Sequence, residues 1–189
     1  MATRQSVTPV TIPSEHLGIN PQDRVHVFID ASNLLGMLRS INMKIDFKKF
    51  LKFLRSETRL VRAGYYALMR DDMGETATRV IDMIEYAGFD VYRKWGQEFQ
   101  EQQGHYRFRG SVVPEMTVAM IAACEGGIDH IVLITGDGEM LAAADAVKQR
   151  EVRLTIVGRE ETASNDLRRI CDSFVDITSL PPSIFMDAA

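Results

Sequence analysis

The sequence predicts a three-layer α/β fold, in which helices cover both faces of a mainly parallel central sheet. Short apolar runs rich in β-branched residues alternate along the chain with stretches in which apolar residues recur every three or four positions. The first pattern is typical of buried strands and the second of amphipathic helices. Their regular alternation favours a parallel sheet joined by right-handed crossovers. At 189 residues, the chain is long enough for one such domain with additional end segments.

The predicted elements follow one another after residue 24. The apolar run at residues 25–29 (VHVFI) stops at Asp30, and a turn and a helix follow it. Asp46 is a suitable N-cap for a helix over 46–57, where apolar residues recur at i, i+3, i+4 and i+7. The same two patterns predict strands at 61–70, 89–95, 129–135, 152–157 and 174–177, and helices at 75–87, 113–125, 140–147 and 163–171.

Both ends of the chain are expected to lie outside the folded domain, which is assigned to residues 25–178. Residues 1–24 hold prolines among Thr and Ser without periodicity, so a flexible extended arm is expected there. Two consecutive prolines, Pro181 and Pro182, begin a tail at residues 179–189. No apolar run approaches the roughly 18 residues of a membrane helix, and the first 24 residues lack the apolar centre of a signal peptide. We therefore expect a cytoplasmic protein.

Composition limits the classes of partner and of metal site. Lys and Arg total 22 against 26 Asp and Glu, a net charge of −4, so a nucleic acid would have to be held by a local basic patch. Cys124 and Cys171 are too few and too far apart for a disulfide framework or a structural zinc site, and buried reduced thiols are expected.

Two acidic turns follow predicted strands, Asp30–Leu34 after the first and Thr135–Met140 after the strand at 129–135. Sites in open parallel sheets form beyond the carboxyl ends of the strands, where the strand order reverses. If these two strands are neighbours, Asp30 and Asp137 converge, with Asn33 and Glu139 one turn inside the following helices. Oxygen ligands without His or Cys suit Mg²⁺ or Mn²⁺, which predicts phosphoryl chemistry.

The same residues also suit purely structural roles. Asp30 and Asn33 are good N-caps, and Gly136–Gly138 is a sensible tight turn in which Asp137 caps a helix. Asp30 argues most strongly for a metal, because a carboxylate directly after five apolar strand residues must be desolvated, paired or metal-bound. Spacing alone leaves both interpretations open.

The motifs Asp30-x-x-Asn33, Ile134–Met140 (ITGDGEM) and Val157-Gly158 resemble the NYN domain family, specifically its LabA-type bacterial branch. The resemblance covers about residues 25–178. It implies a PIN-like nuclease fold and metal-dependent cleavage of RNA. It also places Asp30, Asn33 and Asp137 on active-site positions, and Glu139 where the family usually has a second Asp.

In the mechanism that the resemblance implies, Asp30 and Asp137, assisted by Glu139, hold a cation that orients an attacking water and stabilises the charge on the phosphate. Asn33 positions a water or a substrate oxygen through its amide. Thr135, at the end of its strand, is expected to hold these groups by a hydrogen bond or to contact the substrate.

One departure from the family lies between Arg109 and Ala119. Arg109-Gly110 matches the usual Lys-Gly, but the expected Asp is replaced by Val112 or Val113, and a helix acid by Thr117, Val118 or Ala119; only Glu115 remains as an acid nearby. Fewer carboxylates weaken Mg²⁺ binding. The alternative is therefore a catalytically impaired NYN domain that binds RNA or a protein partner in regulation.

The polar stretch at residues 96–111 interrupts the alternation and predicts a flap or hairpin beside the site. Within it, His105, Arg107 and Arg109 alternate with two aromatic residues, so a strand would present cations on one face. Arginines bind the phosphates that carboxylates repel, which makes this face a candidate RNA contact; Arg70, Arg93 and Lys94 extend the same rim. Taken alone, the pattern favours an ordinary edge strand with one wet face and one buried face over RNA binding.

Two further expectations concern partners. The ten methionines and the apolar segment at 180–186 are compatible with a homodimer, although Met at helical spacing is usually core. A nucleotide-binding or receiver-like domain is disfavoured, because no Gly-rich phosphate loop follows the first strand and no acidic pair stands at its end.

Overall fold

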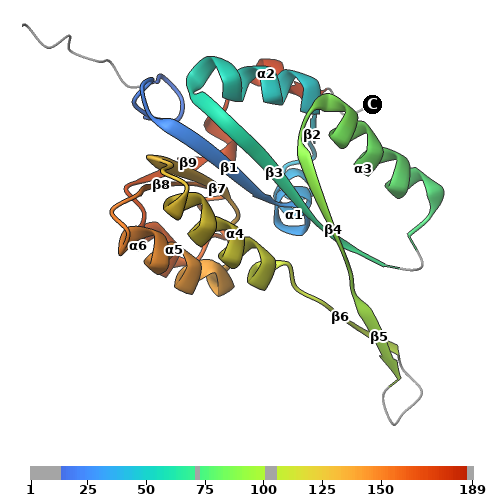
Figure 1. The fold of residues 1–189 in the computed structure, drawn as a ribbon. Helices are drawn as coiled ribbons and strands as arrows, with labels where there is room; N and C mark the ends of the chain where they lie inside the picture. The colour runs from blue at the N-terminus through green and yellow to red at the C-terminus, as the bar shows by residue number, and fades with distance from the viewer. Residues whose placement is uncertain (1–13, 71–72, 101–105, 187–189) are drawn as a thin grey trace, which may run out of the picture.

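The computed structural model describes residues 14–70, 73–100 and 106–186. A parallel six-stranded sheet forms the centre of the fold, in the order β4-β3-β1-β7-β8-β9 (Figure 1). The strands are β1 (Arg24–Asp30), β3 (Arg59–Met69), β4 (Asp90–Trp95), β7 (His130–Ile134), β8 (Arg153–Gly158) and β9 (Ser173–Asp176). The predicted α/β class and parallel sheet are confirmed.

Helices cover both faces of this sheet. The helices are α1 (Ala31–Ser40), α2 (Phe47–Glu57), α3 (Glu75–Ala87), α4 (Val113–Glu125), α5 (Leu141–Lys148) and α6 (Asn165–Ile170). Side chains of α1, α2 and α3 pack in one hydrophobic cluster, and those of α4, α5 and α6 pack in another. Val27 and Phe28, neighbours on β1, lie in different clusters because successive strand residues point to opposite faces.

The strand order reverses at β1. From this central strand, the chain first builds the sheet outward through β3 and β4, and then returns to add β7, β8 and β9 on the other side. Ile29 of β1 pairs with Ile134 of β7, so the turns after these two strands begin side by side. This is the position at which open parallel sheets form ligand sites.

Local signals set several element ends as expected. The Asp46 carboxylate accepts hydrogen bonds from Lys48 N and Lys49 N at the start of α2, at 3.0 and 3.1 Å. Gly88 ends α3 with φ 106°, a conformation that glycine adopts without a steric penalty.

Cys124 and Cys171 are free and partly buried, and burial raises the pKa of each thiol. None of the described helices has the length and apolar character needed to cross a membrane.

Both end segments reach further into the fold than the sequence predicted. Leu17 and Ile19, placed in the expected N-terminal arm, are buried in the core. Beyond the expected boundary at 178, Leu180 and Ile184 are buried as well. The chain passes through two short 3₁₀ turns, Ile177–Ser179 and Pro182–Ile184, before β10 (Phe185–Met186) pairs antiparallel with β2 (Lys44–Ile45). These four residues, Leu17, Ile19, Leu180 and Ile184, form no periodic pattern in the sequence. They are nevertheless buried in the same hydrophobic cluster as the apolar residues of α2.

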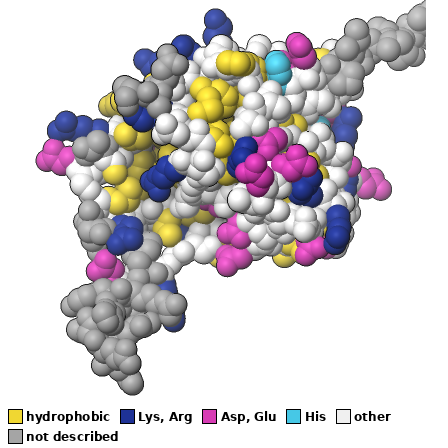
Figure 2. Space-filling view, turned by 180° about the vertical axis from the view of Figure 1, so that it is seen from behind, with side chains coloured by type: hydrophobic (Ala, Val, Ile, Leu, Met, Phe, Trp, Pro, Cys, Tyr) yellow, Lys and Arg dark blue, Asp and Glu magenta, His cyan; other side chains and the backbone are white. Residues whose placement is uncertain are grey.

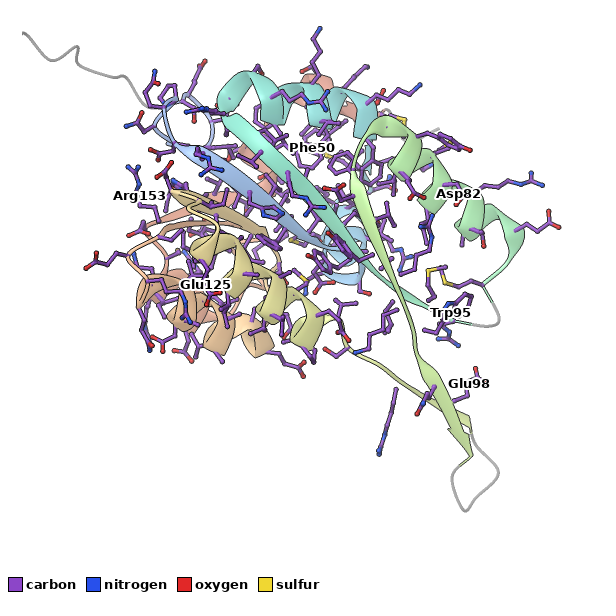
Figure 3. The ribbon with its side chains drawn as sticks, in the orientation of Figure 1. Phe50, Asp82, Trp95, Glu98, Glu125 and Arg153 are labelled. Carbon is purple, nitrogen blue, oxygen red and sulfur yellow. The ribbon has the colours of Figure 1, made fainter. Side chains whose placement is uncertain are left out.

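The predicted hairpin is present in the described residues. β5 (Gln97–Gln100) pairs antiparallel with β6 (Tyr106–Arg109) and projects away from the sheet beyond the carboxyl end of β4 (Figure 1). Figure 3 marks Trp95 where β4 leads into this hairpin and Glu98 within it. The residues between the two strands, His105 among them, lie outside the described residues, and so do 1–13, 71–72 and 187–189.

The apolar residues that lie on the surface, where they could contact a second copy of the chain, differ from those that the sequence suggested for a homodimer. Met116, Met120 and Met140 are fully buried in the core, as are Leu180 and Ile184. Hydrophobic side chains are also visible on the surface seen from behind (Figure 2). In the part of the chain that the structure describes, the exposed large hydrophobic residues are Val61, Val80, Met83, Tyr86, Tyr92, Trp95, Val118 and Met186.

Candidate active site

A cavity of about 650 Å³ lies beyond the carboxyl ends of β1 and β7. Its walls come from one side of α1 along its whole length, from the loop after β7, and from the loop that precedes α6. Asp30 and Asp137 both line it, although they are distant in sequence and only the reversal of strand order brings them together.

Asp30 is the last residue of β1 and the N-cap of α1. Its Oδ1 accepts a hydrogen bond from Asn33 N at 3.2 Å, and its Oδ2 accepts one from Thr135 Oγ1 at 3.4 Å. The residue is only 5% exposed. Burial raises the pKa of this carboxyl group, and the nearby charge of Asp137 adds to the increase, against the lowering effect of the hydrogen bonds.

Thr135 connects the two acids. Its hydroxyl donates to Asp30 Oδ2 and accepts from Asp137 N at 3.2 Å, so one side chain fixes both turns. The residue is completely buried. Of the two roles expected for Thr135, the structure therefore favours positioning through hydrogen bonds, because a completely buried hydroxyl has no access to a substrate.

Asn33 makes a second connection between the turns. Its side-chain Oδ1 accepts a hydrogen bond from Gly136 N at 2.7 Å. This bond engages the amide oxygen, so the group that Asn33 retains for a ligand is its N–H₂, which is a donor. An amide presented in this way suits a phosphate or water oxygen better than it suits a cation.

The loop after β7 packs tightly on the loop before α6. A Cβ on Gly136 would lie 3.1 Å from Ala163 Cα, and one on Gly138 would lie 3.2 Å from Ser164 Oγ. Ser164 N also donates to Gly136 O at 2.9 Å. The two glycines that flank Asp137 therefore allow a close approach of the two backbone segments.

Glu139 is placed differently from the other predicted ligands. Its backbone N–H donates to Asp137 Oδ1 at 3.0 Å, which starts the 3₁₀ turn Gly138–Met140, but its own side chain is exposed and does not line the cavity. Among the described residues, no group of three or more His, Cys, Asp or Glu side chains is close enough to hold a metal. The structure thus gathers two carboxylates at the site.

The chemistry of the cavity nevertheless suits a divalent cation. The described residues that line it include two carboxylates and the hydroxyls of Ser32, Ser40, Thr162 and Ser164, and none of them is Lys or Arg. Mg²⁺ commonly binds through one or two carboxylates while it keeps several waters and meets substrate phosphates. Two acids in a lining of this composition therefore fit such an ion, which would offset their mutual repulsion.

The positions at which the family usually carries further acids are occupied by packing residues. Val112 is buried and Val113 packs against the same cluster, while the Thr117 hydroxyl donates to Val113 O at 2.7 Å within α4. Glu115 forms an ion pair with Lys94 at 2.6 Å, and its hydrogen bond to Lys94 lowers the pKa of the Glu115 carboxyl group. Neither Glu115 nor these positions line the cavity.

The expected basic rim is partly engaged elsewhere. Lys94 is paired with Glu115, and Arg93 binds Asp82 and Glu85 of α3 at 3.0 and 2.7 Å. Arg70 and Arg109 are exposed near the carboxyl ends of β3 and of the hairpin. Arg107 lies in β6, but its side chain is outside the described residues.

Sequence reasoning missed several residues that line the cavity. Ser32, Gly36 and Ser40 of α1 recur every four residues and therefore share one helix face, which is small and polar. This four-residue spacing could have predicted that the three residues share a face of the helix. Thr162 offered none, because its loop reaches the cavity only through the packing of two turns that are distant in sequence.

Comparisons with known proteins agree with this fold. The sequence model of the NYN domain matches residues 24–179. The chain is 25% identical over 161 residues to the low amplitude and bright protein LabA of Synechococcus elongatus, covering 83% of this chain and 85% of that protein. A crystal structure of a Vibrio parahaemolyticus protein of unknown function has the same fold, with a TM-score of 0.68 and 19% identity over 88% of this chain and 98% of the other.

Proposed function

The chain belongs to the NYN domain family, and on this premise we propose that it is a metal-dependent ribonuclease that hydrolyses phosphodiester bonds in RNA. The observation that carries the proposal is the hydroxyl of Thr135, which binds both turns and holds Asp30 and Asp137 in one cavity, where no described lining residue is basic. A structural N-cap has no need of a second carboxylate beside it, because like charges destabilise each other.

Asp30 and Asp137 are the residues that would hold Mg²⁺ or Mn²⁺, and Glu139 is a weaker candidate because its side chain lies outside the cavity. When bound, such an ion supplies charge neutralisation for the phosphate and lowers the pKa of an attacking water. Thr135 and the backbone N–H of Asn33 keep Asp30 in a fixed orientation. The Asn33 amide donates to a phosphate or water oxygen, and the hydroxyls of Ser32 and Ser164 offer further contacts.

The RNA backbone is proposed to reach this cavity along the carboxyl edge of the sheet, where Arg70, Arg107, Arg109 and Lys94 are the candidate phosphate contacts; Lys94 also binds Glu115. A phosphate track of this kind requires an affinity for RNA that falls steeply with salt. The expected homodimer stays a prediction, to be checked by sedimentation.

The test is an incubation of purified protein with end-labelled single-stranded RNA in Mn²⁺, Mg²⁺ or a chelator. Asp30→Asn and Asp137→Asn should abolish cleavage, since each keeps the size of the side chain and removes a negative charge. Asp46→Asn is the matched control, because Asp46 caps α2 as Asp30 caps α1 but does not line the cavity. Cleavage that survives in the chelator, or in both site variants, contradicts the proposal.

The second candidate is an impaired NYN domain that binds RNA or a protein partner. It is favoured by the hydrophobic residues at Val112 and Val113 and by the absence, among the described residues, of any cluster of three potential metal ligands. In the same experiment, this function predicts that labelled RNA is retained without products and that retention does not depend on the metal.

A further inference from the structure

A second cavity, of about 290 Å³, lies on the other side of the sheet, between α4 and the strands β1, β3 and β4. Its α4 wall consists of small residues, Ala119, Ala122, Ala123 and Gly126. Figure 3, in which Glu125 marks the last residue of α4, shows this helix in front of the sheet. The volume is just below the roughly 300–1,000 Å³ typical of small-molecule pockets, so it suits one ring system.

A row of four stacked aromatic rings crosses three strands at this cavity, and three of the rings, those of His26, Tyr66 and Tyr92, line it. His26 and Phe28 of β1 stack at a centroid distance of 4.1 Å, Phe28 and Tyr66 at 6.0 Å, and Tyr66 and Tyr92 at 4.6 Å with only 10° between their planes. Tyr92, at the end of the row on the edge strand β4, is 40% exposed. The row therefore ends in a ring that is accessible to a further flat ring.

Gly64 allows this arrangement. A Cβ at position 64 would lie 2.8 Å from Tyr66 Cε2, closer than real Cβ atoms approach. The Tyr66 ring thus lies back over β3, and its hydroxyl is carried toward Arg62, which lies two residues before Gly64 on the same face of the strand.

Two polar groups in the cavity have hydrogen-bonding capacity left over. Tyr66 is 2% exposed, and its hydroxyl is among the few buried polar atoms of the described residues without a hydrogen-bond partner. Such a group calls for an explanation, for which an ordered water is a usual one. Arg62 donates through Nε to Asp90 Oδ2 at 2.9 Å and through Nη2 to Tyr92 Oη at 3.2 Å, which uses two of its five N–H groups.

The charged groups of this cavity are already engaged by other groups of the protein. Asp90 forms an ion pair with Arg62, and Arg24, which also lines the cavity, donates to the carbonyl of Gly127 at 2.7 Å at the end of α4. Burial and the charge of Arg62 lower the pKa of His26 to about 4, so this ring is neutral at pH 7. A neutral planar ligand with donors and acceptors at its rim matches this wall better than a phosphate does.

We propose that this cavity binds one nucleobase of an RNA strand, stacked against Tyr92 and hydrogen-bonded by Arg62. The inference deepens the proposed function, on which it rests for the choice of RNA as the ligand. Stacking on an aromatic side chain is a general device for holding single-stranded nucleic acid, because every base has a π-face.

The base cavity and the acidic cavity are connected through β1. His26 lines the first and Asp30 lines the second, four residues further along the same strand, a rise of about 13 Å. One cavity is bordered by α4 and the other by α1, which cover opposite faces of the sheet. A strand held in both would therefore cross the carboxyl edge of the sheet, past β3 and β4.

The test uses the full chain and a single-stranded RNA octamer that carries one 2-aminopurine, in a chelator so that no cleavage occurs. Binding is followed by anisotropy, and stacking by quenching of the 2-aminopurine fluorescence. Tyr92→Ala should weaken binding by about five- to a hundredfold and abolish the quenching, whereas Tyr92→Phe keeps the ring and should retain both. Ala122→Phe, which fills the cavity from the exposed side of α4, should weaken binding to a similar extent.

Tyr86→Ala is the matched control, because Tyr86 is a tyrosine that is 88% exposed on α3 and does not line the cavity. Wild-type affinity and quenching in Tyr92→Ala would overturn the base site while leaving the cleavage result untouched. An octamer that does not bind the wild-type protein at low salt also overturns it and leaves the face to a protein partner. Tyr92-dependent binding by a protein that never cleaves RNA supports the base site and refutes the hydrolase.

Discussion

The backbone N–H of Gly136 donates a 2.7 Å hydrogen bond to the side-chain oxygen of Asn33, across 103 residues of sequence. This bond, together with the hydroxyl of Thr135, joins the turn after β1 to the turn after β7. The two turns that carry Asp30 and Asp137 are thus one hydrogen-bonded unit, and the distance between the acids is set by this unit rather than by the sheet alone.

Asn33 variants test the connection between the turns. Asn33→Ala leaves Gly136 N–H without its acceptor and should reduce the free energy of unfolding by about 1–2 kcal/mol. Asn33→Asp keeps an acceptor at the same place and should retain most of the stability, while it adds a third negative charge to the cavity and removes the donor. Urea denaturation measures the stability of both variants. RNA cleavage measures the effect of the added charge and of the lost donor in Asn33→Asp. An unchanged urea midpoint in Asn33→Ala would show that the bond is unimportant.

Metal binding should stabilise the fold through the same two acids. A ligand present at a hundredfold excess over its Kd stabilises by about 2.7 kcal/mol, which raises the Tm of a protein of this size by about 5–10 °C. Asp137→Asn should remove the increase in Tm that Mn²⁺ causes. It should leave the Tm in chelator unchanged or higher, because it relieves the repulsion with Asp30. A lower Tm in chelator would assign Asp137 to a structural role. Asp46→Asn should keep the response to Mn²⁺.

Two glycine substitutions should change stability in opposite directions. Gly64→Ala places a methyl group against the Tyr66 ring, which is fixed between Phe28 and Tyr92, and should destabilise by about 1–3 kcal/mol. Gly36 lies inside α1, and no atom lies within 4 Å of the place that a Cβ would take, so Gly36→Ala should stabilise by about 0.5–1 kcal/mol. Thermal unfolding of both variants checks the pair. A Gly64→Ala protein as stable as the wild type would mean that the ring can move.

Stability should fall as the pH decreases from about 6.5 toward 4. His26 has a pKa of about 4 in the folded protein and 6.5 in the unfolded chain, so below pH 6.5 the unfolded chain binds the proton first. The stability is fully present above pH 6.5, and the loss grows to about 3 kcal/mol near pH 4. Urea titrations at several pH values measure it. His26→Phe should make the curve less steep between pH 6.5 and 5, where most carboxylates stay ionised and where burial also lowers the pKa of His130; an equally steep curve would assign the loss to other groups.

The C-terminal residues should contribute to folding. Ile184 is buried beneath α2, and Ile184→Ala should cost about 2–5 kcal/mol of the free energy of unfolding. Met186→Ala is the control, because Met186 is 44% exposed. Its free energy of unfolding is expected to change by less than about 1 kcal/mol. A chain ending at residue 178 should be destabilised as well. Equal stability of this shortened chain would restore the boundary that the sequence suggested.

Local patterns allowed much of this fold to be predicted. Three of these patterns act within one turn or one strand: the run VHVFI before Asp30, the capping Asp46, and the glycine that ends α3. Their effects can therefore be predicted from the neighbouring residues alone. The end segments escaped prediction because Leu17 and Ile184 have no periodic neighbours, and their burial depends on surfaces made by distant elements.

The sequence by itself determined which residue types stand where two of the strands end: an Asp as the last residue of β1, and a Gly-Asp-Gly turn after β7. Tertiary structure alone decided that these turns meet, because strand order and register are long-range choices that period-two and period-3.6 patterns do not encode. It also decided that the Glu139 side chain does not line the cavity and that the Tyr66 ring lies over Gly64. Both outcomes follow from contacts between backbone segments, which a linear pattern of side chains leaves open.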